Sequence, residues 1–270
     1  LLPGSDPVLK DEVIVIGAHY DHLGLGGPGS SSRTPDTLAI HNGADDNASG
    51  IATILELFEQ LAAAEHKRSI LFIAFAAEEM GTLGAEFFIG NPLVPLEAMK
   101  FMFNFDMVGR LDSTNALTLY GTGTAVGLED LLQELAAPYQ FELAMSPEGL
   151  GPSDHARFYA ANIPALMFFT GLHHDYHTPA DDAEKLNFVG QKRVTEFAYD
   201  VILAAANREE AFVFQEAGPK TKSASRRKLK VTLGIMPDVA AIEKRGMRVD
   251  AVTPGRPAAN AGMRAGDIII

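Results

Sequence analysis

The sequence predicts an α/β fold of three layers, in which helices flank a central, mostly parallel sheet. The first observation is that short apolar runs alternate along the chain with segments of helical periodicity. The second is that these runs are apolar throughout, which is typical of strands buried on both faces of a parallel sheet. The third is that polar side chains follow directly after several runs, where ligands bind in such folds.

The first half of the chain supplies two of the expected strands and two helices. Residues 13–17 are a short apolar run that ends at glycine, which predicts a buried strand, and residues 69–76 predict a second one. The intervening residues 23–43 are rich in Gly, Ser, Pro and Thr, which indicates a long loop. Residues 81–89 and 47–64 predict helices. In the longer one the apolar side chains at helical spacing are Ile51, Ile54, Leu55, Phe58 and Leu61.

The second half continues this alternation. Three further strands are expected, at residues 101–107, 117–120 and 163–169. A helix at residues 128–137 ends at Pro138, because proline cannot continue a helix. The last helix, at residues 188–207, has one apolar face, formed by Val194, Phe197, Ala198, Val201 and Ile202.

Composition narrows the class of protein and the kind of metal ligand. The chain has 270 residues, of which 47% are hydrophobic and 21% charged, which is ordinary for a soluble globular protein. It contains no cysteine, so any metal must be held by His and carboxylate side chains. No apolar run approaches the roughly 18 residues of a membrane span, so none is expected in this chain.

Charge is distributed unevenly and divides the chain. Residues 216–270 contain 11 Lys/Arg and 5 Asp/Glu, a net charge of +6, which leaves −19 for residues 1–215 of a chain with a total of −13. The acidic body argues against a nucleic-acid binder and suits a protein that attracts metals or amines, although solubility alone also explains it. We expect a main domain at residues 1–215, a basic linker at 216–228 and a β-rich segment at 229–270.

Two motifs in the first part of the chain combine residues suited to metal binding. His19 and Asp21 follow the first strand and point the same way on an extended segment, so Asp21 can orient His19. Asp45 and Asp46 lie in GADDNASG at the start of a helix. Taken alone, the first pair is also compatible with an incidental contact, and the second pair with simple helix capping.

Further clusters of the same kind follow the later strands. Glu78 and Glu79 come after the second strand, where buried carboxylates are costly unless they are paired with cations. Adjacent residues point in different directions, so one Glu can bind a metal while the other stays free as a base; a solvated helix start is the alternative. The remaining members are Asp106, the segment Ser153-Asp154-His155, and the segment from His173 to His177.

Together these clusters predict a metal site at one edge of the sheet. Oxygen and imidazole ligands without thiolates suit catalytic zinc or a similar divalent metal. Two metals about 3.5–4 Å apart usually share a bridging carboxylate. In order and spacing, the segments HYDHLG, GADDNASG, AAEEMG, NFDMVGR, SDH and DYHTPADD resemble the M28 family of zinc peptidases, which includes leucyl-type aminopeptidases, glutamate carboxypeptidase II and glutaminyl cyclase.

The resemblance covers residues 8–206 and implies a zinc-exopeptidase fold with two Zn²⁺ ions, although other divalent metals suit the same ligands. It implies that His19 and Asp106 hold the first zinc. It implies that Glu79 and His177 hold the second, and that Asp46 bridges both. The peptide bond that follows Asp46 is expected to be cis, as it often is in this family.

The resemblance implies three catalytic residues beside the metals. Glu78 is expected to be the general base, and Asp21 to orient His19. Tyr176 stands immediately before the last His ligand, a position from which some members stabilise the oxyanion. Other members use a tyrosine three residues before the SDH motif, but that position is Leu150 here.

Residues adjacent to the ligands are expected to support the site. Asp45 is expected to support the ligands or to cap the helix that follows it. Asp154 and His155 are expected to contribute hydrogen bonds, and His173 to line the substrate cleft. His66, in a polar segment, is expected at the surface.

The C-terminal segment resembles the first part of a bacterial PDZ domain, through LGIMPD and VDAVTPGRPAANAGMRAGD at residues 229–270. The resemblance implies that it binds a peptide or protein C-terminus by strand addition. A tail that packs on the main domain is the alternative.

The expected function is a metallo-aminopeptidase that hydrolyses N-terminal residues from peptides. A carboxypeptidase or dipeptidase with the same site is an alternative, because loops set the specificity. A glutaminyl cyclase normally uses one zinc, so retention of His19 and Asp106 argues against it. A non-catalytic peptide-binding scaffold predicts lost ligands, and none is lost. We expect an exported protein, located in the periplasm, the cell envelope or the medium, as family members of this kind usually are.

Overall fold

The computed structural model describes residues 1–220, 233–237, 246–252 and 255–270. Its contacts divide the chain into two units, Leu1–Lys220 and Thr221–Ile270, and each unit is described by itself. Most of the linker expected at residues 216–228 lies outside the described residues. The same holds for residues 229–232, 238–245 and 253–254 of the C-terminal segment.

The main unit contains a six-stranded sheet in the order β2-β1-β3-β6-β4-β5. Its strands are β1 Val13–His19, β2 Ser69–Phe75, β3 Met99–Phe105, β4 Ala116–Tyr120, β5 Glu142–Ser146 and β6 Ala165–Phe169. All neighbours are parallel except β4 and β6. The register of β1 on β2 runs without interruption from Val13↔Ser69 to His19↔Phe75. The mostly parallel sheet confirms the predicted fold class.

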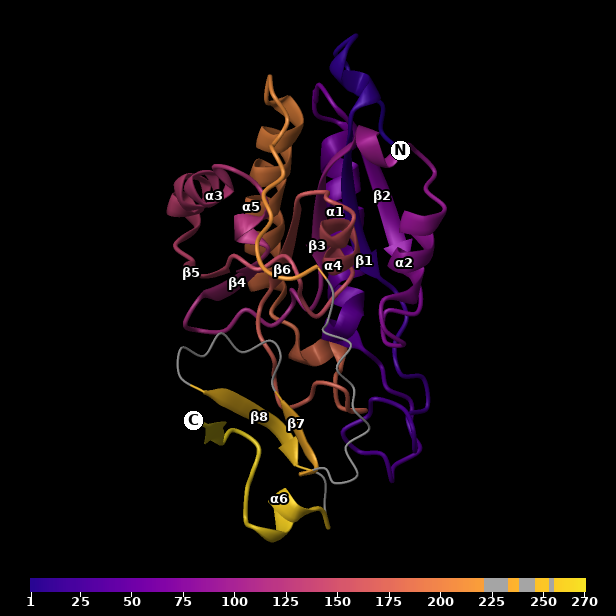
Figure 1. Ribbon diagram of the computed structural model, residues 1–270, viewed down its shortest axis with the longest axis vertical. Helices are drawn as coiled ribbons and strands as arrows, with labels where there is room; N and C mark the ends of the chain where they lie inside the picture. The colour runs from indigo at the N-terminus through magenta and orange to yellow at the C-terminus, as the bar shows by residue number, and fades with distance from the viewer. Residues whose placement is uncertain (221–232, 238–245, 253–254) are drawn as a thin grey trace. The chain divides into compact units, whose positions relative to one another are not determined.

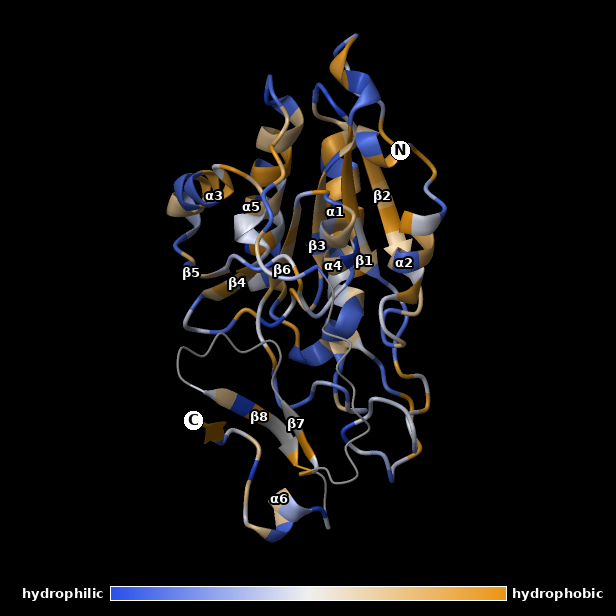
Figure 2. Ribbon diagram, viewed as in Figure 1, coloured by the Kyte–Doolittle hydropathy of each residue, from blue (hydrophilic) through white to orange (hydrophobic). Residues whose placement is uncertain are grey.

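Helices cover both faces of this sheet (Figure 1). They are α1 Gly50–Ala62, α2 Leu83–Gly90, α3 Leu128–Ala136, α4 His155–Ala160 and α5 Phe188–Asn207. Short 3₁₀ turns occur at Leu9–Asp11, Leu96–Ala98, Thr122–Thr124, Ala137–Tyr139 and Ala183–Lys185. In β1, Ile14 and Ile16 join an apolar cluster with α1, α3 and α5, whereas Val13 and Val15 join a second cluster with α2 and α4. Alternate residues of one strand thus reach two cores, which explains why β1 and β2 are apolar along their length (Figure 2).

Two predictions about the elements were wrong or incomplete. The helix expected from residue 47 begins at Gly50, and its buried side includes Leu57 and Leu61, while Leu55 and Phe58 are 63% and 42% exposed. The strand β5 and the helix α4 were not predicted. The last helix has the predicted bounds and the predicted buried face.

The C-terminal unit contains a small antiparallel sheet in the order β7-β8-β9. Its elements are β7 Ile235–Pro237, β8 Met247–Val252, α6 Pro257–Asn260 and β9 Ile268–Ile269. In the described parts of both units, no helix has the length and apolar character needed to cross a membrane.

Candidate metal centre

The candidate ligands come from segments that follow the carboxyl ends of neighbouring parallel strands. His19 is the last residue of β1, Glu79 lies in the turn after β2, and Asp106 follows β3. Asp46 lies in the turn Ala44–Ser49 before α1, and His177 in the loop after β6. Because β2, β1, β3 and β6 are adjacent and parallel, these ends meet at one edge of the sheet.

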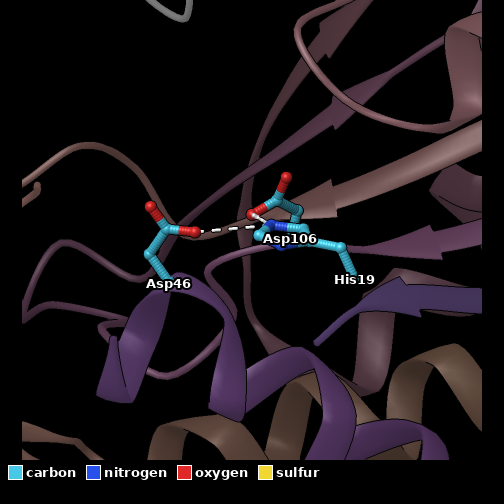
Figure 3. Close-up of side chains that lie close together, drawn as sticks. All are labelled: His19, Asp46 and Asp106. Atoms are coloured by element: carbon cyan, nitrogen blue, oxygen red, sulfur yellow. Dashed lines mark ion pairs between the residues drawn. The ribbon is translucent and has the colours of Figure 1, made fainter. Parts of the chain in front are cut away.

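The first group of candidate ligands consists of His19, Asp46 and Asp106, all buried. Nε2 of His19 lies 3.4 Å from Oδ1 of Asp46 and 3.5 Å from Oδ1 of Asp106. Figure 3 shows both carboxylates directed toward the His19 ring. The sequence predicted that these three residues share a metal.

The second group surrounds the other oxygen of Asp46. Nε2 of His177 lies 3.1 Å from Oδ2 of Asp46 and 3.1 Å from Oε2 of Glu79. His22, to which the sequence assigned no role, joins Asp46 and Glu79 in a set of donor atoms close enough to hold an ion. Asp46 therefore belongs to both groups and presents a different oxygen to each.

These separations fit a divalent metal in each group. Zinc binds nitrogen and oxygen ligands at about 2.0–2.2 Å, so two ligands of a tetrahedral ion lie about 3.4 Å apart. The four histidine–carboxylate distances of 3.1, 3.1, 3.4 and 3.5 Å are close to this value. The donor set of imidazoles and carboxylates is also the one that catalytic zinc uses.

The pKa values show that the carboxylates and imidazoles of the centre stabilise each other's charged forms. Burial raises the pKa of Asp46, but hydrogen bonds with His177 and His19 outweigh this effect and hold the pKa well below its usual range. Burial lowers the pKa of His177, but contacts with Asp46 and Glu79 outweigh it and raise the pKa to about 10. The carboxylate of Asp46 is thus ionised and paired with imidazolium groups, and metal ions can take the place of the imidazolium protons.

Asp21 links the His19 segment to the turn that carries the two glutamates. Its Oδ1 accepts a hydrogen bond of 3.0 Å from the N–H of Glu78, and its Oδ2 accepts one of 3.3 Å from the N–H of Glu79. Nδ1 of His19 lies 3.1 Å from the carbonyl oxygen of Asp21 and 3.7 Å from its Oδ1. A donor at Nδ1 leaves Nε2 of His19 free to face the carboxylates.

Glu78 and Tyr176 lie at the centre without being part of either ligand group. Burial, followed by the charge of Asp106, raises the pKa of Glu78 to about 9. The ring of Tyr176 stacks on that of His177 at a centroid distance of 3.8 Å. Burial and the charges of nearby carboxylates, Asp46 first, raise the pKa of Tyr176, so its hydroxyl keeps its proton and can donate a hydrogen bond.

Two supporting contacts were not predicted. Oδ2 of Asp181, a fully buried side chain in the DYHTPADD segment, accepts hydrogen bonds from the N–H groups of Asp45 and Asp46, at 2.8 and 3.0 Å. Nδ1 of His177 lies 3.0 Å from the carbonyl oxygen of Ser31 in the long loop, which leaves its Nε2 for the centre. Only the abundance of acidic residues in DYHTPADD pointed toward Asp181.

Among the described residues, the side chains of Asp154 and His155 form none of the expected hydrogen bonds. Both carboxylate oxygens of Asp154 and both ring nitrogens of His155 are buried and have no hydrogen-bond partner among the described residues. Burial raises the pKa of Asp154 to about 7 and lowers that of His155 to about 3. The motif placed Asp154 within reach of the charges of His19 and Asp106 but did not determine its hydrogen-bond partners.

The structure also describes the surroundings of Asp45, His173 and His66 and the conformation of the peptide bond after Asp46. Oδ1 of Asp45 accepts a 2.7 Å hydrogen bond from the N–H of Gly109, and its Oδ2 lies 3.2 Å from Nε2 of His173. His66 is 5% exposed, with Nδ1 at 2.7 Å from the carbonyl oxygen of Arg68, so its predicted surface position was wrong. The peptide bond after Asp46 is cis, as expected.

The fold and the centre define an α/β protein with a His and carboxylate cluster suited to divalent metals. The sequence matches peptidase family M28 over residues 1–202, and the chain belongs to that family.

The relatives include proteins named as aminopeptidases. Aminopeptidase YwaD of Bacillus subtilis is 29% identical over 221 residues, which cover 78% of this chain and 43% of that protein. The uncharacterized protein YfbL of Escherichia coli is 29% identical over 220 residues, which cover 68% of this chain and 64% of that protein. The chain therefore spans less than two thirds of the length of either relative.

A solved structure shows the same fold. A zinc aminopeptidase from Bacillus subtilis superposes with a TM-score of 0.62 at 26% identity, covering 78% of this chain and 50% of that chain. The LapA aminopeptidase of Legionella pneumophila gives a TM-score of 0.59 at 28% identity, covering 75% and 53% of the two chains.

Proposed function

We propose that this chain is a zinc aminopeptidase whose centre holds two Zn²⁺ ions. The observation that carries the proposal is the carboxylate of Asp46, whose two oxygens face two separate groups of donors. A carboxylate shared in this way suits two metals about 3.5–4 Å apart, as in many metal-dependent hydrolases. Membership of family M28 and the names of the relatives support the same activity.

The residues that would hold the metals divide between the two groups. His19 and Asp106 would hold one ion, Glu79 and His177 the other, and Asp46 would contact both. Bound there, the metals supply Lewis acidity, which polarises the scissile carbonyl and lowers the pKa of the attacking water.

Glu78 is proposed as the general base. Its carboxylate takes no part in a hydrogen bond or ion pair among the described residues, so it is free to exchange a proton. The charges of Asp106, Asp154 and Glu79 add to the effect of burial and outweigh that of His19, so cations bound in the centre would lower the pKa of Glu78 from about 9 toward neutrality. Glu78 would take a proton from the attacking water and deliver it to the nitrogen of the leaving amine.

Tyr176 is proposed as the hydrogen-bond donor to the oxyanion that develops on the scissile carbonyl. Its stacking on His177 places the side chain beside the second group of ligands. A neutral hydroxyl that is held in a buried position stabilises a developing charge more than a solvated one does. Asp21 would orient His19, which is a ligand of the first metal.

The distinguishing experiment follows the products released from peptides of defined sequence. The zinc-loaded chain is expected to release N-terminal residues one after another, to lose this activity with a chelator and to regain it with zinc. Peptides acetylated at the N-terminus serve as the control and should remain intact. Release from the C-terminus, or equal cleavage of the acetylated peptides, would show a carboxypeptidase or another specificity instead.

We also propose that residues 229–270 contribute to a PDZ-type peptide-binding module. The sequence segments LGIMPD and VDAVTPGRPAANAGMRAGD support this, and so does a sheet with an antiparallel β7-β8 pair, to which a peptide strand can be added. A fluorescent peptide with a free C-terminal carboxylate should bind the chain more tightly than its amidated counterpart. Equal binding of the two peptides, or none, contradicts the proposal.

A further inference from the structure

His22 is the third histidine of the centre, and neither the sequence pattern nor the family resemblance gave it a role. It lies three residues beyond His19, and only 9% of its side chain is exposed. Its Nδ1 lies 2.8 Å from Oε1 of Glu79 and 3.8 Å from Oδ2 of Asp46. A histidine this close to two candidate ligands is either a ligand itself or a group that holds one in place.

The distances separate these two roles. Two ligands of one tetrahedral zinc ion lie about 3.4 Å apart, and the pairs that involve His19 and His177 lie 3.1–3.5 Å apart. The 2.8 Å between His22 and Glu79 is shorter than any of these. It has the length of a charge-assisted hydrogen bond from an N–H to a carboxylate.

The positions available for hydrogen atoms on His22 agree with this assignment. Its Nε2 is buried and has no hydrogen-bond partner among the described residues. An N–H at that position would be a buried donor without an acceptor, so a neutral ring carries its proton on Nδ1. A protonated Nδ1 donates to Glu79 and has no lone pair left for a metal.

We propose that His22 is a positioning residue for the second metal. Its Nδ1–H holds Oε1 of Glu79, so that Oε2 stays turned toward Nε2 of His177 at 3.1 Å. The ring of His22 is held in turn by an edge contact with His177, at a centroid distance of 5.8 Å. Gly43 leaves room for it, since a Cβ at that residue would lie 2.7 Å from Cγ of His22.

This role rests on the proposed two-metal centre and is tested by metal binding rather than by activity. Partners that orient a ligand typically change metal affinity by about 10- to 100-fold. Zinc binding to the metal-free chain is therefore measured by calorimetry for the wild type, His22→Ala, His22→Asn and the control His174→Asn, whose histidine is exposed.

The expected results separate the possible roles. His22→Ala should still bind two ions but bind one of them about 10- to 100-fold more weakly. His22→Asn, whose amide N–H can replace the Nδ1–H, should recover most of that affinity, and His174→Asn should match the wild type. Wild-type affinities in His22→Ala overturn the role of His22 alone. Fewer than two ions in the wild type contradict the proposed centre itself.

A second measurement on the wild type remains decisive if the variants fold poorly. In the Co²⁺-loaded chain, each metal-bound imidazole keeps one N–H proton, which gives a strongly shifted, exchangeable NMR resonance. Binding through Nε2 of His19 and of His177 gives two such resonances. A third resonance, or the loss of one metal in both His22 variants, makes His22 a ligand and overturns the inference.

Discussion

Asp46 turns its two carboxylate oxygens toward two different imidazoles, and this divides a crowded centre into two metal positions. Oδ1 lies 3.4 Å from His19 and Oδ2 lies 3.1 Å from His177. The residue is only 3% exposed, so the cost of burying its charge must be offset by these partners or by cations. A buried carboxylate with one partner on each oxygen is well suited to bridge two ions.

The substitution Glu78→Gln tests whether Glu78 acts as the general base or as a metal ligand. Glutamine has nearly the same shape but cannot accept the proton, so kcat should fall about 10²- to 10⁴-fold while both metals stay bound. Metal content is measured by mass spectrometry, and kcat with an unblocked peptide. Glu59→Gln, on the exposed side of α1, is the control and should change neither quantity. A lost metal ion in Glu78→Gln would identify Glu78 as a ligand.

The five proposed ligands could be predicted because each lies in a short motif at or just after an apolar run or at a helix start. The contacts of Asp181 and His22 could not be predicted, because they depend on how the long loops are placed in space. The same limit applies to Asp154, whose carboxylate has no hydrogen-bond partner among the described residues: a motif fixes the order of residues along the chain, but not the distance to a partner.

Among the elements, the turn Ala44–Ser49 is the one that determines where Asp46 lies. Nδ2 of Asn47 donates a 2.9 Å hydrogen bond to the carbonyl oxygen of Phe105, which ties the turn to the end of β3. The turn begins after Gly43, whose φ of 61° is in the left-handed region. The N–H of Ala48 donates a 3.0 Å hydrogen bond to the carbonyl oxygen of Gly43. The turn is thus closed on itself and tied to the end of β3.

Gly43→Ala is expected to disturb this turn by more than its backbone preference explains. A Cβ there would lie 2.3 Å from the carbonyl oxygen of Asp46. We expect a loss of unfolding free energy of more than about 2 kcal/mol, of which the left-handed conformation accounts for about 1–2 kcal/mol. Zinc affinity should fall as well, because the turn carries Asp46.

The matched control is Gly24→Ala. Gly24 has a similar φ of 63°, but a Cβ there would meet no atom within 4 Å. The Gly24→Ala variant should therefore lose only about 1–2 kcal/mol of unfolding free energy, from the left-handed conformation, and keep its zinc affinity. Urea unfolding and zinc titration of both variants measure the difference, and equal losses in the two would contradict the role given to the turn.

Elements with a strong hydrophobic periodicity could be predicted, and elements with a weak periodicity could not. The 20 residues of α5 repeat their apolar face over several turns, and the bounds and face agree with the sequence. In α1 the apolar residues spread over two adjacent faces, so periodicity alone did not decide between Leu57 and Phe58. The strand β5 is partly exposed at the edge of the sheet, and α4 has only 6 residues, too few for a periodic signal.

For the main unit as a whole, the topology brings residues distant in sequence to one point. The strands β2, β1, β3 and β6 are adjacent and parallel, so the loops that follow them share one edge, although the ligands range from His19 to His177. Bound metals would therefore cross-link segments from most of the unit. Metal binding to the folded state alone stabilises that state by an amount that grows with the logarithm of the affinity, so the effect should appear in global unfolding.

Chelation should accordingly lower the melting temperature of the chain, by an amount that depends on pH. In the metal-free state the pKa of His177 is raised from 6.5 to about 10, so its charge pairing stabilises the fold fully below about pH 6.5 and is lost as the pH rises through about 10. In the loaded state the imidazole must be neutral, so zinc binding releases protons and becomes tighter as the pH rises. The difference in melting temperature between the zinc-loaded and chelated chain should therefore widen from about pH 6 to about pH 9. Thermal unfolding followed by circular dichroism measures both states, and a difference that is constant or narrows with pH would contradict metal binding through His177.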